Sequence, residues 1–401
     1  MTQDNPHIGR LLQMIVGHLD IPKSLYERAA ARHVNLGEWL QRPESKVAEF
    51  DPDVRPQGSF RFGTVIRPLL KDDEFDLDNV CVLNKLGKED RTQKELKELF
   101  GDEVKAYAKA HKMPKPVSEH KRCWRLQYSD EVNFHLDTLP CVPEEGDVVQ
   151  RLVSLGVDSE LAGRAVAITD KRDPNYDQVT SAWPSSNSRG FAKWFEERAA
   201  LGRSRSLSGR EVRAMVEEVP PYEWQTTLQQ SIQLMKRHRD VRFSDPKVAD
   251  LAPISMIITN LAARAYGGEA DLRVALGRIV ETMTGFVQAE SPKVPNPADP
   301  EEDYADKWRL EPKLEESFWE WHEALKSDLA ALSDAIDEGK AGEIAKRLFA
   351  VELTEEELRE IEKGKRGGGG PAVITSGLLK ESGPAAEPKR AVSKEGGGRY
   401  A

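Results

Sequence analysis

Two aspartates separated by one residue, Asp76 and Asp78, stand at the head of an apolar run that ends at Leu83. The run, DLDNVCVL, is rich in β-branched and other apolar residues and is typical of a buried strand. Because successive side chains of a strand point to opposite faces, the two carboxylates are expected on the same face. The pattern therefore predicts a sheet that presents two acids side by side.

A third aspartate, Asp137, lies in a second strand-like run, VNFHLDTLPCV, at 132–142. A run at 121–128 precedes it across a short polar connector, and the two runs are predicted to form a hairpin. If the strands of Asp76 and Asp137 are neighbours in one sheet, three carboxylates converge, and clustered carboxylate oxygens are the ligands that Mg²⁺ prefers. Two such ions, about 3.5–4 Å apart, stabilise the attacking and leaving oxygens of phosphoryl or nucleotidyl transfer. The alternatives are a solvent-facing Asp137 and a calcium site, although the spacing of a known calcium loop does not follow.

A glycine–serine pair, Gly58-Ser59, precedes the acidic strand, and Gly63-Thr64 comes a few residues later. Glycine lets the backbone approach a phosphate, and backbone N–H groups at a helix start bind anions together with a serine hydroxyl. With the acids, this segment predicts a nucleoside triphosphate whose phosphates span the loop and the metal ions. Taken alone, a glycine–serine pair is also an ordinary turn.

The rest of the chain predicts an α+β fold. Apolar residues recur at helical spacing in 8–19, 25–40 and 92–110. From about residue 144 the chain is predicted to be mostly helical, with the most apolar helix in 250–266. A mixed, twisted sheet that carries the acids is expected to pack against helices, and a helical second lobe is expected to close a cleft over them.

Composition restricts the partners and the compartment. The net charge of −10 and the sequence pI of about 5.5 argue against a protein that coats nucleic acids, although a local basic pocket stays open. The scattered Cys81, Cys123 and Cys141 form neither a disulfide framework nor a CxxC pair, as expected in a reducing cytoplasm. No stretch of about 18 apolar residues occurs, so neither a membrane-spanning helix nor a membrane partner is expected. Residues 363–401 are rich in Gly, Pro and Ser and are predicted to be a disordered tail.

The string GSFRFGTVIRPLLKDDEFDLDNVCVL resembles the signature of the DNA polymerase β-like nucleotidyltransferases. Among these it is most similar to the bacterial CD-NTases, relatives of animal cyclic GMP–AMP synthase. The resemblance implies synthesis of a cyclic oligonucleotide from NTPs, ATP among them, with loss of pyrophosphate. It assigns the triphosphate to Gly58 and Ser59. It assigns the metal ions, Mg²⁺ or alternatively Mn²⁺, to Asp76, Asp78 and Asp137, and to Asp137 also a part in activating the attacking hydroxyl.

The resemblance also gives the chain a domain order. The expected parts are N-terminal helices that form a spine (1–50), a nucleotidyltransferase core (51–145), a helical lobe that closes the nucleotide cleft (146–362) and the disordered tail (363–401). Glu74 and Asp76 form a competing acidic pair within the core. The apolar run begins just after Asp78, as it does after the second acid in the family, and this favours the pair of Asp76 and Asp78.

Further likenesses extend the expected nucleotide site into the helical lobe. LQQSIQLMKRHRD resembles a helix whose lysine reaches the phosphates, which points to Lys236, although a solvated lysine is equally compatible. Ser255 resembles a buried serine near the triphosphate, and its alternative role is a helix cap. Ser186 and Asn187 lie in a stretch that resembles a wall of the nucleotide pocket in some relatives, beside an aromatic stripe that fits a core. His135 is expected to be an inward-facing strand neighbour of the acids rather than a metal ligand.

The resemblance extends to partners. In bacteria such enzymes belong to CBASS anti-phage operons, where the cyclic product switches on a separate effector. The C-terminal end, GGGRYA, resembles termini that are handled by ubiquitin-transfer-like or HORMA-domain partners, with an ordinary frayed end as the alternative. Activation by DNA is not expected, because the net charge is acidic and the sequence lacks the Cys/His metal ribbon that cyclic GMP–AMP synthase uses for DNA. The competing functions are nucleotidyl transfer to RNA 3′ ends, a drug or a protein, and a catalytically silent scaffold that acts through its tail.

Overall fold

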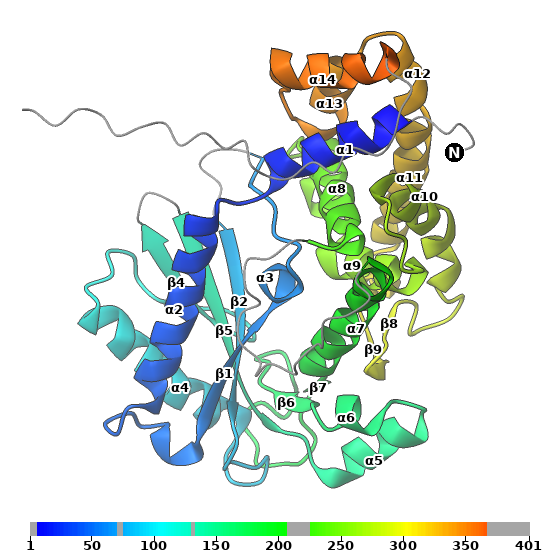
Figure 1. The fold of residues 1–401 in the computed structure, drawn as a ribbon. Helices are drawn as coiled ribbons and strands as arrows, with labels where there is room; N and C mark the ends of the chain where they lie inside the picture. The colour runs from blue at the N-terminus through cyan, green and yellow to red at the C-terminus, as the bar shows by residue number, and fades with distance from the viewer. Residues whose placement is uncertain (1–5, 70–74, 130–132, 207–224, 367–401) are drawn as a thin grey trace, which may run out of the picture.

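The computed structural model describes residues 6–69, 75–129, 133–206 and 225–366. Within these ranges a mixed sheet and two groups of helices make an α+β fold, which confirms the predicted fold class (Figure 1). The predicted tail lies mostly outside the described residues. Helix α14 (Glu355–Arg366) nevertheless runs past residue 363, where the tail was expected to start.

The sheet has a main path in the order β1–β2–β5–β4–β3, and β6 and β7 extend it beyond β5. Strands β2 and β5 pair in parallel, and the other neighbouring strands pair antiparallel. The antiparallel pairing of β4 with β5 confirms the predicted hairpin. The strands of this sheet are β1 (Pro52–Gln57), β2 (Phe75–Leu83), β3 (Ser118–Glu119), β4 (Trp124–Ser129), β5 (Asn133–Pro143), β6 (Val166–Ile168) and β7 (Ser185–Ser186).

The two faces of strand β2 have different surroundings. Leu77 and Leu83 on one face belong to a core that they share with the apolar side chains of α2 (Lys23–Gln41) and α4 (Gln93–Ala110). Helix α4 starts at a reciprocal cap in which the Thr92 hydroxyl accepts from the Glu95 backbone N–H and the Glu95 carboxylate accepts from that of Thr92. The opposite face of β2 is the one that carries the acids.

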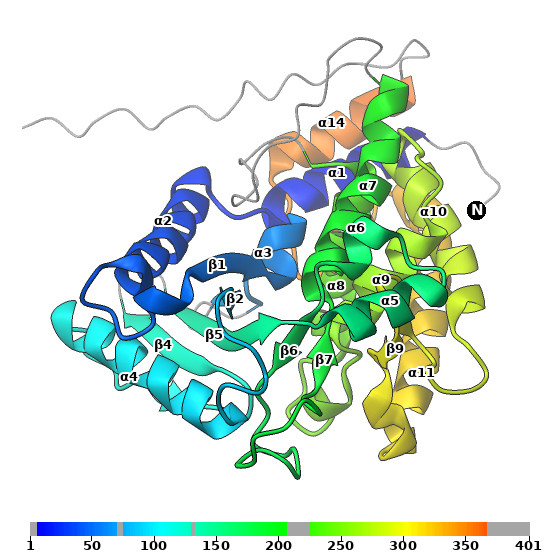
Figure 2. The same ribbon diagram turned by 90° about the horizontal axis from the view of Figure 1, so that it is seen from below.

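The helical part of the molecule has its own core. Helix α1 (Pro6–Leu19) contributes Leu11, Leu12 and Ile15 to it, whereas α2 packs on the sheet, so the two N-terminal helices connect the parts. Figure 2 shows α2 and α4 beside the sheet and α7 to α11 gathered on the other side of the molecule. The helices from the sheet's end onwards are α5 (Gly146–Ser154), α6 (Ser159–Ala162), α7 (Ser188–Ser206), α8 (Thr227–Arg242), α9 (Ser255–Ala265), α10 (Leu272–Thr282), α11 (Pro312–Ala330), α12 (Leu332–Asp337), α13 (Ala341–Phe349) and α14.

The region after residue 144 is less purely helical than the sequence predicts. Strands β6 and β7 continue the sheet, and β8 (Pro295–Asn296) and β9 (Asp299–Asp303) form a separate hairpin. These strands have two to five residues, which is too short for an alternating pattern to emerge from the sequence. Within the described ranges, no helix combines the length and the hydropathy needed to cross a bilayer.

Candidate active site

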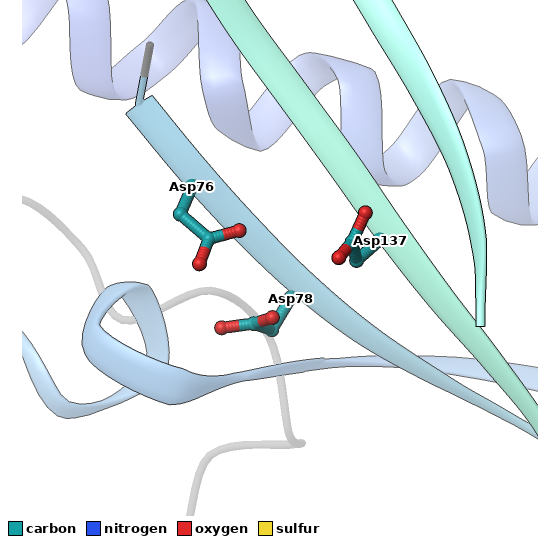
Figure 3. Close-up of side chains that lie close together, drawn as sticks. All are labelled: Asp76, Asp78 and Asp137. Carbon is teal, nitrogen blue, oxygen red and sulfur yellow. The ribbon is translucent and has the colours of Figure 1, made fainter. Parts of the chain in front are cut away.

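Three carboxylates converge on the open face of the sheet. Asp76 and Asp78 project from β2 and Asp137 from β5 (Figure 3). One oxygen of each carboxylate lies within 4.8 Å of the others. Asp78 stands directly opposite Asp137 in the parallel ladder, so the pairing of two strands distant in sequence assembles the group. The structure thus brings together the three acids that the sequence singled out.

The electrostatics of this acidic triad favour a bound cation. Burial, followed by the charges of Asp76 and Asp137, raises the pKa of Asp78 to about 7. A divalent ion among the carboxylates would remove this repulsion. The donors are all hard oxygen atoms, the set that Mg²⁺ and Mn²⁺ prefer over softer ligands. The residues present therefore fit the expected ions.

Asp137 is held by an arginine that the sequence interpretation did not identify. The Arg125 guanidinium donates from Nε to Oδ1 at 2.6 Å and from Nη2 to Oδ2 at 2.7 Å, so both carboxylate oxygens are engaged. Arg125 lies opposite Asp137 in the antiparallel hairpin of β4 and β5. The predicted hairpin therefore contained the signal, because opposite charges at opposed positions of a ladder attract.

His135 contacts the triad through Asp76. Its Nε2 lies 2.9 Å from Oδ1 of Asp76, and the two residues face each other across the ladder of β2 and β5. Burial disfavours the imidazolium, but the hydrogen bond to Asp76 and the negative charges of Asp76 and Asp137 together outweigh it and raise the pKa of His135. The histidine is an inward-facing neighbour of the acids, as expected, and it compensates part of their charge.

The glycine–serine pair starts the short helix α3 (Gly58–Phe62), which follows β1 directly. Gly58 has a φ of +61°, a backbone conformation that residues other than glycine rarely adopt. A Cβ atom at this position would also overlap the Oδ2 atom of Asp78. The turn therefore passes directly over Asp78, and only glycine fits there.

A cavity of about 760 Å³ opens beside Asp76 and Asp78 of the triad, within the size range of ligand pockets. Its wall includes Gly58, Ser59, Asp76 and Asp78 from the sheet side, and Lys236 and Ser255 from the helical side. The cavity also meets residues that the sequence interpretation missed, among them Arg67, Arg239 and Asp240. These three carried no recognisable signal, because charged residues on a helix or in a loop are usually solvated.

Lys236 is buried rather than solvated. It lies on α8, and its Nζ donates to the backbone carbonyl of Thr64 at 2.9 Å. Burial, followed by the charge of Arg239, lowers the pKa of Lys236 to about 8. The solvated alternative is therefore wrong, and the ammonium stands at the cavity wall close to the acids.

Ser255 is the first residue of α9, and Ile254 occupies the cap position, so the helix-cap alternative is wrong. The serine hydroxyl accepts from Nη1 of Arg239 at 3.1 Å, and the same nitrogen donates to the Pro253 carbonyl. The side chain is half-buried and lines the cavity. Arg239 thereby ties the end of α8 to the start of α9 at this wall.

Asn187 does not lie at the cavity wall, which corrects its expected role in nucleotide binding. Its side chain is fully buried, and Nδ2 donates to the carbonyls of Leu161 at 2.9 Å and Ala298 at 2.7 Å. Its Oδ1 accepts from the Gly190 backbone N–H at 2.9 Å, as an N-cap residue of α7 does. Ser186 donates to Glu302 at 2.8 Å. This stretch closes the start of a helix, and its polar groups are used within the protein.

Comparison with known proteins agrees with this geometry. Residues 52–141 match the family model of the nucleotidyltransferase domain of cyclic GMP–AMP synthase DncV-like proteins. A c-di-GMP synthase of Roseivirga ehrenbergii is 25% identical over 366 residues, which cover 90% of this chain and 89% of that protein.

Two solved structures share the fold. The CD-NTase CdnG of Bradyrhizobium diazoefficiens, in complex with GTP, has a TM-score of 0.59 and 21% identity, covering 90% of this chain and 100% of that chain. Vibrio cholerae DncV, a cyclic AMP-GMP synthase in complex with the linear intermediate pppA(3′,5′)pG, has a TM-score of 0.51 and 13% identity, covering 88% of each chain. Residues 52–141 therefore match the model of the DncV-like nucleotidyltransferase domain, and the chain shares the fold of the CD-NTases.

Proposed function

We propose that the protein is a metal-dependent nucleotidyltransferase that joins NTPs into a cyclic oligonucleotide and releases pyrophosphate. One observation carries the proposal: Asp76 and Asp78 of the acidic triad line a cavity that is also lined by the Gly58-Ser59 turn and the buried Lys236. A triphosphate needs cationic and N–H donors along its length, and its α-phosphorus needs divalent charge beside it.

The triad is the proposed metal site. Asp76 and Asp78 would hold the ions, and Asp137 would complete the set by sharing with an ion the oxygens that Arg125 already engages. Bound there, Mg²⁺ or Mn²⁺ supplies Lewis-acid stabilisation of the charge that develops on the phosphoryl oxygens.

The protein's own groups orient the reactants. The Ser59 hydroxyl and the Lys236 ammonium, on two walls of one cavity, hold the triphosphate. Ser255, fixed by Arg239, offers a further hydroxyl at the same wall. A ribose hydroxyl of the second nucleotide attacks the α-phosphorus, its proton passes to a carboxylate of the triad, and the bond to pyrophosphate breaks. A second round of the same step closes the ring.

Guanine nucleotides are proposed as substrates together with ATP. The relative from Roseivirga is named a c-di-GMP synthase, and the CdnG structure contains GTP. The anti-phage role and the effector implied by the sequence resemblance stay predictions. The expected recognition of Tyr400 and Ala401 by a partner falls outside the described residues.

The test is an incubation of the purified protein with α-labelled ATP, GTP, CTP and UTP and with Mg²⁺ or Mn²⁺, followed by phosphatase and mass spectrometry. A cyclic product resists phosphatase, whereas NTPs and linear 5′-triphosphate ends do not. The variant carrying Asp76→Asn and Asp78→Asn is the control, and it is expected to stay folded and make no product. If an RNA, a drug or a protein is added as acceptor and becomes labelled while no cyclic product forms, the result would support nucleotidyl transfer to that acceptor instead. No transfer at all under any of these conditions would favour a silent scaffold.

A further inference from the structure

We propose that Gln229, Gln233 and Arg237 of α8 are positioning residues that hold the phosphate-binding turn at a fixed place relative to Lys236. The inference rests on the proposed function, because it concerns how that site is kept in shape. The segment from Phe62 to Arg67 lies between α3, which the Gly58-Ser59 turn starts, and strand β2 in the order of the chain.

The contacts form a ladder from α8 side chains to backbone carbonyls of this segment. Gln229 Nε2 donates to the Phe62 carbonyl at 2.9 Å. Gln233 Nε2 donates to the Val65 carbonyl at 2.8 Å. Lys236 adds its bond to Thr64, and Arg237 Nη2 donates to the carbonyl of Arg67. We call these four bonds the α8 ladder.

The spacing of the donors matches a single helix face. Positions 229, 233, 236 and 237 follow i, i+4, i+7 and i+8, so the four side chains lie along one stripe of α8. Eight residues of helix advance by roughly 12 Å. Five residues of extended chain advance by at most roughly 17 Å. The segment 62–67 can therefore run along the helix, with Phe62 bonded at the first donor and Arg67 at the last, while the bonds of Gln233 to Val65 and of Lys236 to Thr64 cross between them.

The α8 ladder is built into the protein interior. Gln233 is fully buried, and Arg237 and Lys236 are 4% and 6% exposed. Gly63 has a φ of +63°, and a Cβ atom there would lie 2.6 Å from Nε2 of Gln229. The first rung of the α8 ladder therefore depends on a glycine at 63, because any side chain would displace the donor.

The α8 ladder acts directly on the proposed phosphate site. The Thr64 N–H donates to the Ser59 carbonyl at 2.9 Å, so the segment that the ladder holds is bonded to the turn that carries the Ser59 hydroxyl. At the other end, Lys236 is itself a rung and also lines the cavity. The distance between the serine hydroxyl and the ammonium thus follows the register between α8 and residues 62–67. A small misplacement of groups that hold a substrate has a large effect on rate.

The test compares Gln229→Met and Gln233→Met with the matched control Gln230→Met. All three changes remove the same amide from α8. Gln230 lies outside the α8 ladder and exchanges hydrogen bonds with Gln13 at the protein surface. Gln229 is half-buried, so its variant serves if the fully buried Gln233→Met protein fails to fold. Because Gln229 Oε1 also accepts from the Thr226 N–H in the cap of α8, Gln229→Met is compared in addition with Thr226→Ala, which weakens the cap and leaves the bond to Phe62 in place.

Two measurements are made on each protein with its full chain. The first is amide hydrogen exchange of the peptide covering 58–65. The second is calorimetric binding of a GTP analogue with a methylene bridge between the α- and β-phosphates, which cannot release pyrophosphate. The ladder variants are expected to exchange faster in 58–65 and to bind the analogue about tenfold more weakly. The Gln230→Met protein is expected to match the wild type in both.

The inference would be overturned if the ladder variants matched the Gln230→Met protein in the hydrogen exchange of 58–65 or in their affinity for the analogue. Ser59→Ala and Lys236→Met separate this outcome from a failure of the proposed function. If these two variants weaken binding of the analogue while the glutamine variants do not, the site binds phosphate and the α8 ladder does not position it. If Ser59→Ala and Lys236→Met also bind like the wild type, the proposed function itself is wrong.

Discussion

Gly58 and Asp78 are in such close contact that a Cβ atom on Gly58 would overlap the Oδ2 atom of Asp78. The turn that is proposed to hold the triphosphate therefore rests on the carboxylate that is proposed to hold the metal ion. The positive φ of Gly58 adds an independent reason for glycine at this position. Phosphate binding and metal binding are thus coupled by packing, and a single added methyl group would disturb both.

Gly58→Ala is expected to lower the free energy of unfolding by about 1–3 kcal/mol, because alanine is strained at this φ and the methyl group displaces Asp78. Mn²⁺ binding, measured by calorimetry, should weaken, and the rate of nucleotide synthesis should fall below one-tenth of the wild-type rate. Gly17→Ala is the control, because Gly17 is exposed on α1 and has nothing within 4 Å of the added atom. That change should stabilise the protein slightly. Wild-type Mn²⁺ affinity in Gly58→Ala would contradict the coupling.

Arg125→Met tests the clamp on Asp137. The change leaves a mostly buried carboxylate without its bidentate partner, which should lower the free energy of unfolding in EDTA by about 1–3 kcal/mol. Mn²⁺ should then raise the melting temperature of the variant more than that of the wild type, because the ion no longer competes with a guanidinium. Arg122→Met is the control, since Arg122 pairs with Asp170 and not with the triad. Equal Mn²⁺-induced shifts in Arg125→Met and the wild type would show that Arg125 does not compete with the metal.

Lys236 should give nucleotide affinity a characteristic pH dependence. Its pKa is lowered to about 8 by burial, so the ammonium is charged below pH 8 and becomes neutral as the pH rises through that value. Lys236→Met should therefore weaken binding of the methylene-bridged GTP analogue about tenfold at pH 7. At pH 9.5 the variant and the wild type should differ by about threefold or less. A constant ratio of the two dissociation constants from pH 7 to 9.5 would contradict a phosphate contact by the charged lysine.

The C-terminal boundary can be tested with two truncations. Helix α14 is anchored on α1: His18 Nε2 lies 2.9 Å from Glu357 Oε1, Arg10 donates to the Glu360 carbonyl, and Ile361 is buried. A chain that ends at residue 366 keeps these contacts, and we expect its melting temperature and its nucleotide synthesis to stay close to those of the full chain. A chain that ends at residue 354 loses them and should melt at least about 4 °C lower. Equal melting temperatures of the two truncated chains would show that α14 adds nothing to the fold.

A partner at the C-terminus needs a separate measurement. Tyr400→Ala and Ala401→Glu leave all described contacts in place, so basal nucleotide synthesis is expected to stay unchanged. Pull-down or covalent conjugation by a HORMA-domain or ubiquitin-transfer-like protein should then be lost in these variants alone. If these variants were still pulled down or conjugated like the wild type, the terminal residues would not be the recognition site of such a partner.

The local pattern of the sequence predicted much of the fold because short-range rules govern it. The alternation of side chains along β2 places Asp76 and Asp78 on one face in any strand, whatever lies beside it. The helical periods near 8–19, 25–40 and 92–110 became α1, α2 and α4, and the apolar run at 250–266 contains α9. The hairpin of β4 and β5 followed from two strand-like runs with a short connector.

The same rules failed where a role depends on what surrounds a residue. Asn187 follows a serine pair in a stretch that suggested a pocket wall, yet it caps α7 in the interior. Lys236 was equally compatible with a solvated helix face, and only the packing of α8 against the Phe62–Arg67 segment buried it. The strands β6 to β9 were too short to show a period.

The sequence by itself thus determined the two acids of one strand, the glycine–serine turn before them and the helical periods, because each depends on neighbours within a few residues. Tertiary structure decided the rest of the site. The parallel register of β2 and β5 set Asp137 opposite Asp78, and no local pattern specifies which residues of two distant strands face each other. The packing of α8 on residues 62–67 placed Lys236 beside the acids and lowered its pKa, since burial and charge depend on the whole surrounding protein.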